Sequence, residues 1–190
     1  IKNNQNYGLG GTHKVAFMIT NSNNYEYCCI LHGDDQADPS DLAALKCSFS
    51  NYDAMLGSRF SRRSTLSGYS KSRILGNLLI NAIYTVTLGK KVKDLGSGLN
   101  IFSRKVTSSP EINHFPDGMY FNTSLLMLVL DKYNYKFFPI SWKETDQSSN
   151  ARNFDVAKNI LKNLYHTKFK KMPYGNKKFN EINDYQYEKI

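Results

Sequence analysis

Short apolar runs that alternate with helical patterns are the feature that most restricts the fold of this chain. Strands are predicted at residues 25–31, 52–57, 99–102 and 136–142. Helices are predicted at residues 12–24, 69–88, 120–133 and 153–165, and a further helix is predicted to begin at Ser40. This alternation indicates an α/β domain with a mostly parallel sheet flanked by helices. Ligands of such sheets bind beyond the carboxyl ends of the strands, so the turns after the predicted strands are the first places to look for a site.

The size and charge of the chain limit its partners. Its 190 residues are enough for one domain with a core, and its net charge of +9 favours anionic partners. These include nucleotide phosphates, lipid phosphates, an acidic membrane surface and nucleic acid. The Lys and Arg residues are scattered and no nucleic-acid-binding motif is present, so we do not expect nucleic acid among the partners.

The cysteines and the apolar segments indicate the compartment. Cys28, Cys29 and Cys47 lack the spacing of a zinc site or a disulfide framework, so we expect them to be apolar core residues in a reducing compartment. The apolar run 74–88 is shorter than the roughly 20 residues of a membrane span, which predicts a buried or surface-lying helix. No secretory leader pattern opens the sequence. We therefore expect a cytoplasmic protein, whose basic, aromatic stretch 165–179 is either a solvated tail or a contact with the inner face of a membrane.

The strongest chemical signal is the turn HGDDQADP at residues 32–39, directly after a predicted strand. Oxygen ligands as dense as these suit a hard cation such as Mg²⁺ or Mn²⁺, which also takes oxygens from a diphosphate. The alternative is a solvated acidic turn that caps the helix beginning at Ser40, and acidity alone favours this plainer interpretation.

Three weaker signals lie beside other strands. Arg59, after the strand at 52–57, could hold phosphate oxygens with two parallel hydrogen bonds, although a surface salt bridge would explain it equally well. Asp94 opens the run DLGSGL, whose glycines allow a close approach to a ligand and whose carboxylate could accept a proton; a plain capped turn is the alternative. The polar run at 142–151 could close over a ligand as a lid or be an exposed connection that caps the last helix.

Taken in order, these segments resemble the family 2 glycosyltransferases with a GT-A fold, especially the branch that transfers sugars to polyprenyl or dolichyl phosphates. The resemblance covers about residues 3–155. Each segment is weakly specific alone, but six in the same order are quite specific. The segments are NYGLGG at 6–11, HGDDQADP at 32–39, GSRF at 57–60, the helix at 73–81, DLGSGLNIFSR at 94–104 and FPISWKETDQSSNAR at 138–152.

The resemblance implies a site. The family's metal motif, Asp-x-Asp-x-Gln, falls on His32, Asp34 and Gln36, so these residues are expected to bind Mn²⁺ or Mg²⁺. His32 replaces the family's first Asp, and imidazole is also able to bind Mn²⁺. The resemblance places Arg59 beside the diphosphate and Asp94 near the acceptor, as a base or an orienting group. The other substrate contacts that it implies are Ser97, Gly98, Trp142, Gln147 and Ser149.

The resemblance also predicts domain limits and a reaction. The strands with which this family begins have no counterpart here, so we expect residues 1–166 to form the later part of a GT-A domain and residues 167–190 to form a basic, polar tail. The implied reaction is an inverting transfer of a sugar from a UDP or GDP donor to a polyprenyl phosphate or a cell-surface glycan. The alternatives are a non-catalytic, glycosyltransferase-like partner subunit and a basic nucleic-acid-binding module.

Overall fold

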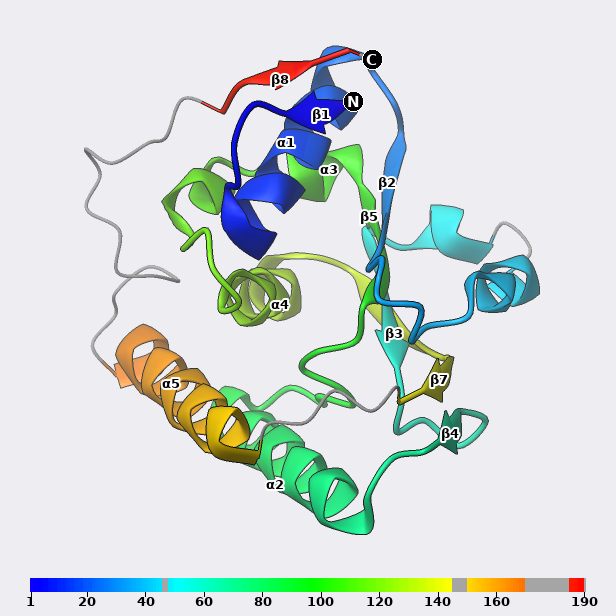
Figure 1. Cartoon of the computed structure of the whole chain (residues 1–190), viewed down its shortest axis with the longest axis vertical. Helices are drawn as coiled ribbons and strands as arrows, with labels where there is room; N and C mark the ends of the chain where they lie inside the picture. The colour runs from blue at the N-terminus through cyan, green and yellow to red at the C-terminus, as the bar shows by residue number, and fades with distance from the viewer. Residues whose placement is uncertain (46–47, 145–149, 170–184, 190) are drawn as a thin grey trace.

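A four-stranded sheet runs through the middle of the protein (Figure 1). The structure, a computed structural model, describes residues 1–45, 48–144, 150–169 and 185–189. The sheet strands are β2 (Tyr27–Leu31), β3 (Ala54–Ser58), β5 (Leu99–Ser103) and β6 (Tyr135–Pro139). They confirm the four predicted strands, with ends that differ by a few residues.

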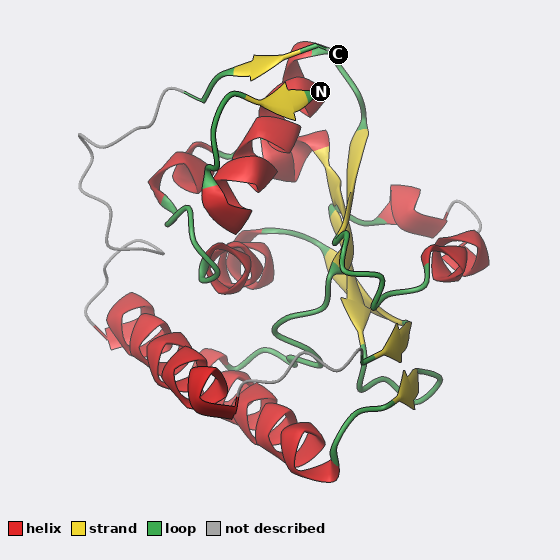
Figure 2. Cartoon of the chain, in the orientation of Figure 1, coloured by secondary structure: helices red, strands yellow, loops and turns green. Residues whose placement is uncertain are grey.

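Helices cover one face and one end of this sheet. They are α1 (Gly8–Ser22), α2 (Lys71–Leu88), α3 (Arg104–Thr107), α4 (Phe121–Lys132) and α5 (Asn150–Phe169). Helices α1, α3 and α4 lie against the face, and α2 and α5 lie together at the end (Figure 1). The other face carries short 3₁₀ helices, among them η1 (Pro39–Leu45) and η2 (Ser48–Asn51), while η3 (Pro110–His114) precedes α4 (Figure 2). The protein is therefore a layered α/β fold, as predicted.

The sheet is mixed, so the prediction of a mostly parallel sheet was wrong. Its strand order is β2-β5-β3-β6, with β5 antiparallel to both neighbours and only β3 and β6 paired in parallel. The reason is the position of α2, which lies beyond the end of β3 rather than across the face of the sheet. The chain therefore re-enters the sheet at the end where it left, and β5 must run in the opposite direction.

Two apolar cores lie on opposite faces of the sheet. The larger is formed with the helices and contains Ala54 and Leu56 of β3, whereas Met55 packs into the smaller core on the side of η1. All five residues of β3 are buried, because the strand supplies side chains to both cores. This central strand therefore fixes the position of the residue that follows it, Arg59.

The long helices follow their sequence signals. Ser70 caps α2 by accepting a hydrogen bond from the Arg73 amide, and Gly89 ends the helix with φ of 65°.

The helix predicted at Ser40 is the 3₁₀ helix η1. The basic loop at 61–68 contains a strand that the sequence did not predict, β4 (Thr65–Ser67), which pairs in parallel with β7 (Ser141–Lys143). No helix in the described ranges is long and apolar enough to span a bilayer.

The two ends of the chain lie together (Figure 1). Strand β1 (Lys2–Asn3) pairs with β8 (Tyr187–Glu188), and the buried ammonium of Lys14 binds Asp117 at 2.8 Å and the Tyr185 hydroxyl at 3.2 Å. Residues at the end of the expected tail thus pack on α1. Gly10 permits the neighbouring approach of α1 to α4, because a Cβ there would lie 2.6 Å from the Cβ of Phe121.

Candidate active site

A cleft opens beyond the carboxyl ends of β2 and β3, between the sheet, α2 and the start of α4. Its volume is about 610 Å³, within the usual range for a small-molecule site. The cleft brings together five of the predicted site residues: His32, Asp34, Gln36, Arg59 and Trp142. Further lining comes from residues that the sequence analysis did not single out, among them Tyr69, Arg73, Asn77, Tyr120 and Asn122.

The acidic turn supplies one side of the cleft. His32 directly follows β2, and its backbone amide donates to the Gly98 carbonyl at 2.9 Å. Asp34 is exposed, and the Gln36 carbonyl accepts a hydrogen bond of 2.8 Å from the Lys143 amide, which ties the turn to β7. Asp38 rather than Asp34 caps η1, by accepting from the Ser40 amide at 2.8 Å. Helix capping therefore does not account for Asp34.

The surroundings of His32 favour the neutral form of its imidazole. Burial lowers the pKa of His32, and the nearby charge of Asp34 opposes this only in part. The ring packs on Gly98, where a Cβ would lie 2.9 Å from two atoms of the imidazole. A glycine at position 98 therefore leaves the room that the His32 ring occupies. A neutral imidazole next to a carboxylate is able to bind a metal ion.

A second imidazole lies behind the first. The rings of His13 and His32 meet edge to face with centroids 5.7 Å apart. The Nδ1 of His13 lies 2.6 Å from the Leu9 carbonyl oxygen, and this nitrogen must carry the proton because a carbonyl only accepts. Burial lowers the pKa of His13 as well. His13 thus supports His32 from α1, and nothing in its sequence context distinguished it from a core residue.

Arg59 and Asp94 form a buried ion pair at the base of the cleft. The Asp94 carboxylate accepts hydrogen bonds from Nε of Arg59 at 2.8 Å, from Nη2 at 2.7 Å, from the Arg59 amide at 2.9 Å and from the Gly96 amide at 3.0 Å. Only 1% of the Asp94 side chain is exposed. Burial alone would lower the pKa of Arg59, but the charge and hydrogen bonds of Asp94 raise it well above its ordinary value. Arg59 is therefore a permanent cation with a fixed orientation.

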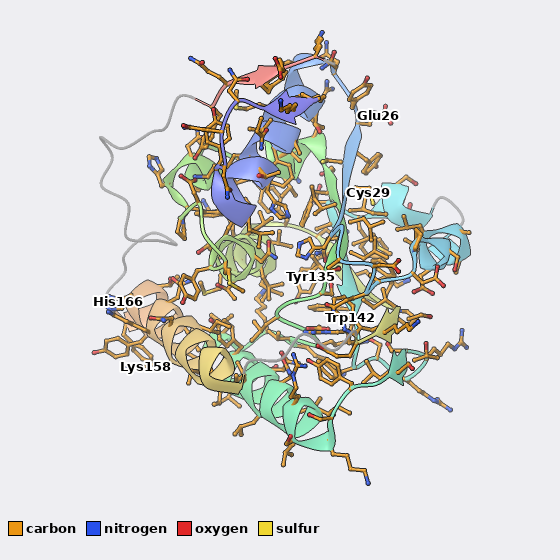
Figure 3. The ribbon with its side chains drawn as sticks, viewed as in Figure 1. Glu26, Cys29, Tyr135, Trp142, Lys158 and His166 are labelled. Atoms are coloured by element: carbon orange, nitrogen blue, oxygen red, sulfur yellow. The ribbon has the colours of Figure 1, made fainter. Side chains whose placement is uncertain are left out.

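Aromatic rings surround the guanidinium of Arg59. Its Cζ lies 5.0 Å from the centroid of Trp142, 5.3 Å from Phe60 and 5.8 Å from Tyr69. Trp142 is buried between the end of the sheet and α2 (Figure 3). Asp94 binds Nε and Nη2, so Nη1 is the nitrogen of Arg59 that is turned toward the cleft, where it donates a long hydrogen bond of 3.4 Å to the Tyr69 hydroxyl.

A second guanidinium enters the cleft from α2. Arg73 pairs with Glu144 at 2.6 Å and lies 5.0 Å from the Tyr69 ring, whereas the Asn77 amide donates to the Tyr69 hydroxyl at 3.1 Å. Arg73 and Asn77 are four residues apart and share one face of α2. That spacing was the available signal, but it does not reveal which face is turned toward a site.

The other predicted site residues have different positions. Ser97 is buried in the turn before β5, where its hydroxyl lies 3.4 Å from the Leu99 carbonyl oxygen and from Oδ1 of Asn100. Asp94 and Ser97 line a much smaller cavity beneath the cleft, together with His13 and Asn122. Gln147 and Ser149 lie outside the described residues.

The donor atoms fit a metal ion only in part. Within the described ranges, no cluster of three or more His, Cys, Asp and Glu side chains could by itself hold a metal. The acidic turn offers one carboxylate, one imidazole and the amide of Gln36, all on the cleft. Such a set fits Mg²⁺ or Mn²⁺ if a bound diphosphate completes the coordination, because Mg²⁺ commonly takes only one or two carboxylates from the protein.

Comparison with known proteins does not assign the chain to a family. No model of a known protein family matches it, and no significant match is found among curated proteins. Its function must therefore be argued from the cleft.

Proposed function

We propose that this protein is an inverting glycosyltransferase that moves a sugar from a nucleotide diphosphate, of the UDP or GDP type, to a polyprenyl phosphate or a cell-surface glycan. One observation carries the proposal. Two guanidinium groups, those of Arg59 and Arg73, line the same cleft as Asp34 of the acidic turn, at the carboxyl ends of β2 and β3. Two cations and a carboxylate that could bind a metal ion, all lining one cleft, suit a bound diphosphate.

The two arginines have separate roles in this proposal. Arg59 cannot adjust its position, because Asp94 and three rings hold it, so it provides a preorganised charge where negative charge develops on the departing diphosphate. Arg73 is about one third exposed and can exchange its Glu144 partner for a phosphate oxygen. When bound, Mn²⁺ or Mg²⁺ at Asp34, His32 and Gln36 would neutralise charge on the same diphosphate.

The position of Asp94 favours a positioning role. Its carboxylate oxygens already accept four hydrogen bonds, two of them from the guanidinium. A general base needs a free lone pair within reach of the acceptor proton. A phosphate acceptor needs little help from a base, because its oxygen is already a nucleophile. The geometry thus agrees better with a phosphorylated lipid than with a hydroxyl acceptor that depends on Asp94.

The experiment is a thermal unfolding series with UDP, GDP and their sugar conjugates, each with Mn²⁺ and with a chelator. A ligand at about 100 times its dissociation constant adds roughly 2.7 kcal/mol to the stability of the folded state, and the melting temperature then rises by several degrees. We expect a Mn²⁺-dependent rise with one nucleotide. The same small shift with every nucleotide, unaffected by the chelator, would count against the proposal and leave the non-catalytic alternative.

A further inference from the structure

The outer face of α2 is apolar although it is exposed. This outer α2 face consists of Leu75, Leu78, Leu79, Ala82 and Val86, whose spacing of three and four residues places them on one side of the helix. The exposed fraction is 70% for Leu75, 61% for Leu79 and 83% for Val86. Ala82 is exposed too. A stripe of this kind marks an interaction surface rather than a scattering of single apolar residues.

Helix α2 is apolar on both sides: Ile80, Ile83 and Leu88 pack against the larger core, and leucines also lie on the outside. Its buried residues are Asn81, whose amide donates to the Lys93 carbonyl at 3.0 Å, and Tyr84. A helix on the surface of a domain normally turns its apolar side to the core and its polar side to water. In α2, an asparagine is buried while two leucines are more than half exposed. The outer face must therefore gain its stability from something other than this domain or water.

The segment that contains the outer α2 face is basic, although Arg59 and Arg73 within it pair with Asp94 and Glu144 from other segments. Residues 59–93 contain no Asp or Glu. They contain eight basic residues: Arg59, Arg62, Arg63, Lys71, Arg73, Lys90, Lys91 and Lys93. Lys71 at the beginning of α2, and Lys90 and Lys91 just after its end, are exposed. The partner of this face is therefore apolar in the middle and negative at the edges.

Helix α5, beside α2, also carries basic and aromatic residues at exposed positions. It packs on α2, with the Tyr84 hydroxyl donating to the Ile160 carbonyl at 2.8 Å. Its exposed residues include Lys158, Lys162, Tyr165 and Phe169, which again recur every three or four positions. Both helices lie at the end of the molecule opposite α1 and β1 (Figure 1), and Lys158 is seen on α5 at that end (Figure 3). Lysines beside exposed aromatic rings are typical of surfaces that meet a lipid headgroup layer.

We propose that the outer α2 face, with the lysines at both ends of the helix, docks the protein peripherally on an anionic lipid bilayer. The leucines and Val86 would enter the boundary between headgroups and acyl chains, and the lysines would bind the lipid phosphates. A second copy of the chain fits less well, because pairing two such faces would bring basic edges against each other. The bilayer, in contrast, complements both the apolar middle and the charge.

This docking places the candidate active site next to the membrane. The inner side of the same helix lines the cleft with Arg73, Gly76, Asn77 and Ile80. Helix α2 would therefore lie between the cleft and the headgroups. The docking does not rest on the proposed transfer reaction, since it requires neither nucleotide nor metal, and the two proposals can fail independently.

The test is co-sedimentation of the full chain with vesicles, in chelator and without nucleotide. We expect binding to vesicles of phosphatidylcholine with phosphatidylglycerol and much weaker binding to phosphatidylcholine alone. The double substitution Leu75→Glu with Leu79→Glu should weaken binding by about tenfold or more. Both positions are exposed, so the melting temperature should stay close to that of the parent. The matched control is Met18→Glu with Tyr25→Glu, which makes the same kind of change at exposed positions near the opposite end.

A charge series completes the test. Lys90→Gln with Lys91→Gln should also weaken binding to the anionic vesicles by about tenfold, whereas Lys2→Gln with Lys189→Gln should not. Equal binding by the leucine variant and the parent would overturn the proposal. Failure of the parent protein to bind the vesicles would also overturn it. In that case, a dimer of the parent in solution that dissociates on the double substitution Leu75→Glu with Leu79→Glu would identify the outer α2 face as a contact between two copies of the chain.

Discussion

The side chains of Arg59 and Asp94 form a two-pronged, buried ion pair, with N–O distances of 2.8 and 2.7 Å, that ties the end of β3 to the turn before β5. The pair joins segments 35 residues apart in sequence. It fixes the guanidinium at the base of the cleft. It also holds together the two ends of the connection that runs from β3 through α2 to β5.

Asp94→Asn should destabilise the protein as well as inactivate it. Breaking a buried ion pair from one side leaves the other charge without its partner and costs about 3–5 kcal/mol. Urea unfolding of the variant measures this loss. The control is Glu188→Gln, which breaks the exposed pair with Lys2 and should leave the unfolding midpoint unchanged. A variant with normal stability and low turnover would instead favour Asp94 as the base.

The positions of Arg59 and Asp94 show what the sequence could predict. Arg59 directly follows a predicted strand and Asp94 lies in the turn before another, so both were predicted to be site residues, and the structure places them in contact. Their pairing could not be predicted, because it depends on α2 returning the chain to the same end of the sheet. The prediction of a mostly parallel sheet failed for the same reason, since an amphipathic pattern identifies a helix but not where it packs.

Other residues that line the cleft could not be predicted, because their sequence context does not distinguish them. Arg73 and Asn77 lie within an apolar helix and resemble its ordinary polar positions. Their place on the cleft follows from the orientation of α2, whose inner side carries them beside Ile80 and whose outer side carries leucines. The acidic turn was recognisable because its carboxylates directly follow a strand. The packing of the His32 ring on Gly98 could not be recognised in the sequence, because it depends on contacts between β2 and β5.

Asp34→Asn should remove the metal dependence of nucleotide binding. The substitution keeps the shape of an exposed side chain but removes the one carboxylate of the predicted metal set. We expect a loss of about tenfold or more in affinity for Mn²⁺ with UDP or GDP, whichever binds, by calorimetric titration. Asp35→Asn is the matched control, because Asp35 adopts φ of 57°, which asparagine tolerates, and it does not line the cleft. Equal affinities for the two variants would contradict a metal site at Asp34.

Arg73→Ala should weaken diphosphate binding with little effect on stability. Removing a charge-assisted hydrogen bond to phosphate costs about 1.5–3 kcal/mol of binding free energy. The Arg73–Glu144 pair is partly exposed, so its loss should change the unfolding free energy by less than about 1 kcal/mol. Lys71→Ala removes a neighbouring charge of α2 that does not line the cleft, and it should bind nucleotide in solution like the parent. If both variants lose affinity equally, the loss comes from a weaker positive potential over the whole basic surface and not from a contact between Arg73 and the diphosphate.

His13 should make the fold less stable in mild acid. Burial between Phe121, 5.3 Å away between ring centroids, and His32 lowers its pKa in the folded state. The unfolded chain therefore takes up the proton first, and stability that is fully present above the unfolded pKa of about 6.5 falls as the pH drops below it. The limit is about 1.4 kcal/mol per pH unit for each such group, and His32 contributes in the same direction.

The measurement is urea unfolding in chelator between about pH 7.5 and 5.5. His13→Asn keeps a side-chain donor near the Leu9 carbonyl but removes the titrating ring, so it should reduce the slope of stability against pH even where it lowers stability overall. The slope is the informative quantity, because loss of the stacked ring lowers stability by a similar amount at every pH. A variant whose stability runs parallel to that of the parent across this range would show that His13 is not the group being protonated on unfolding.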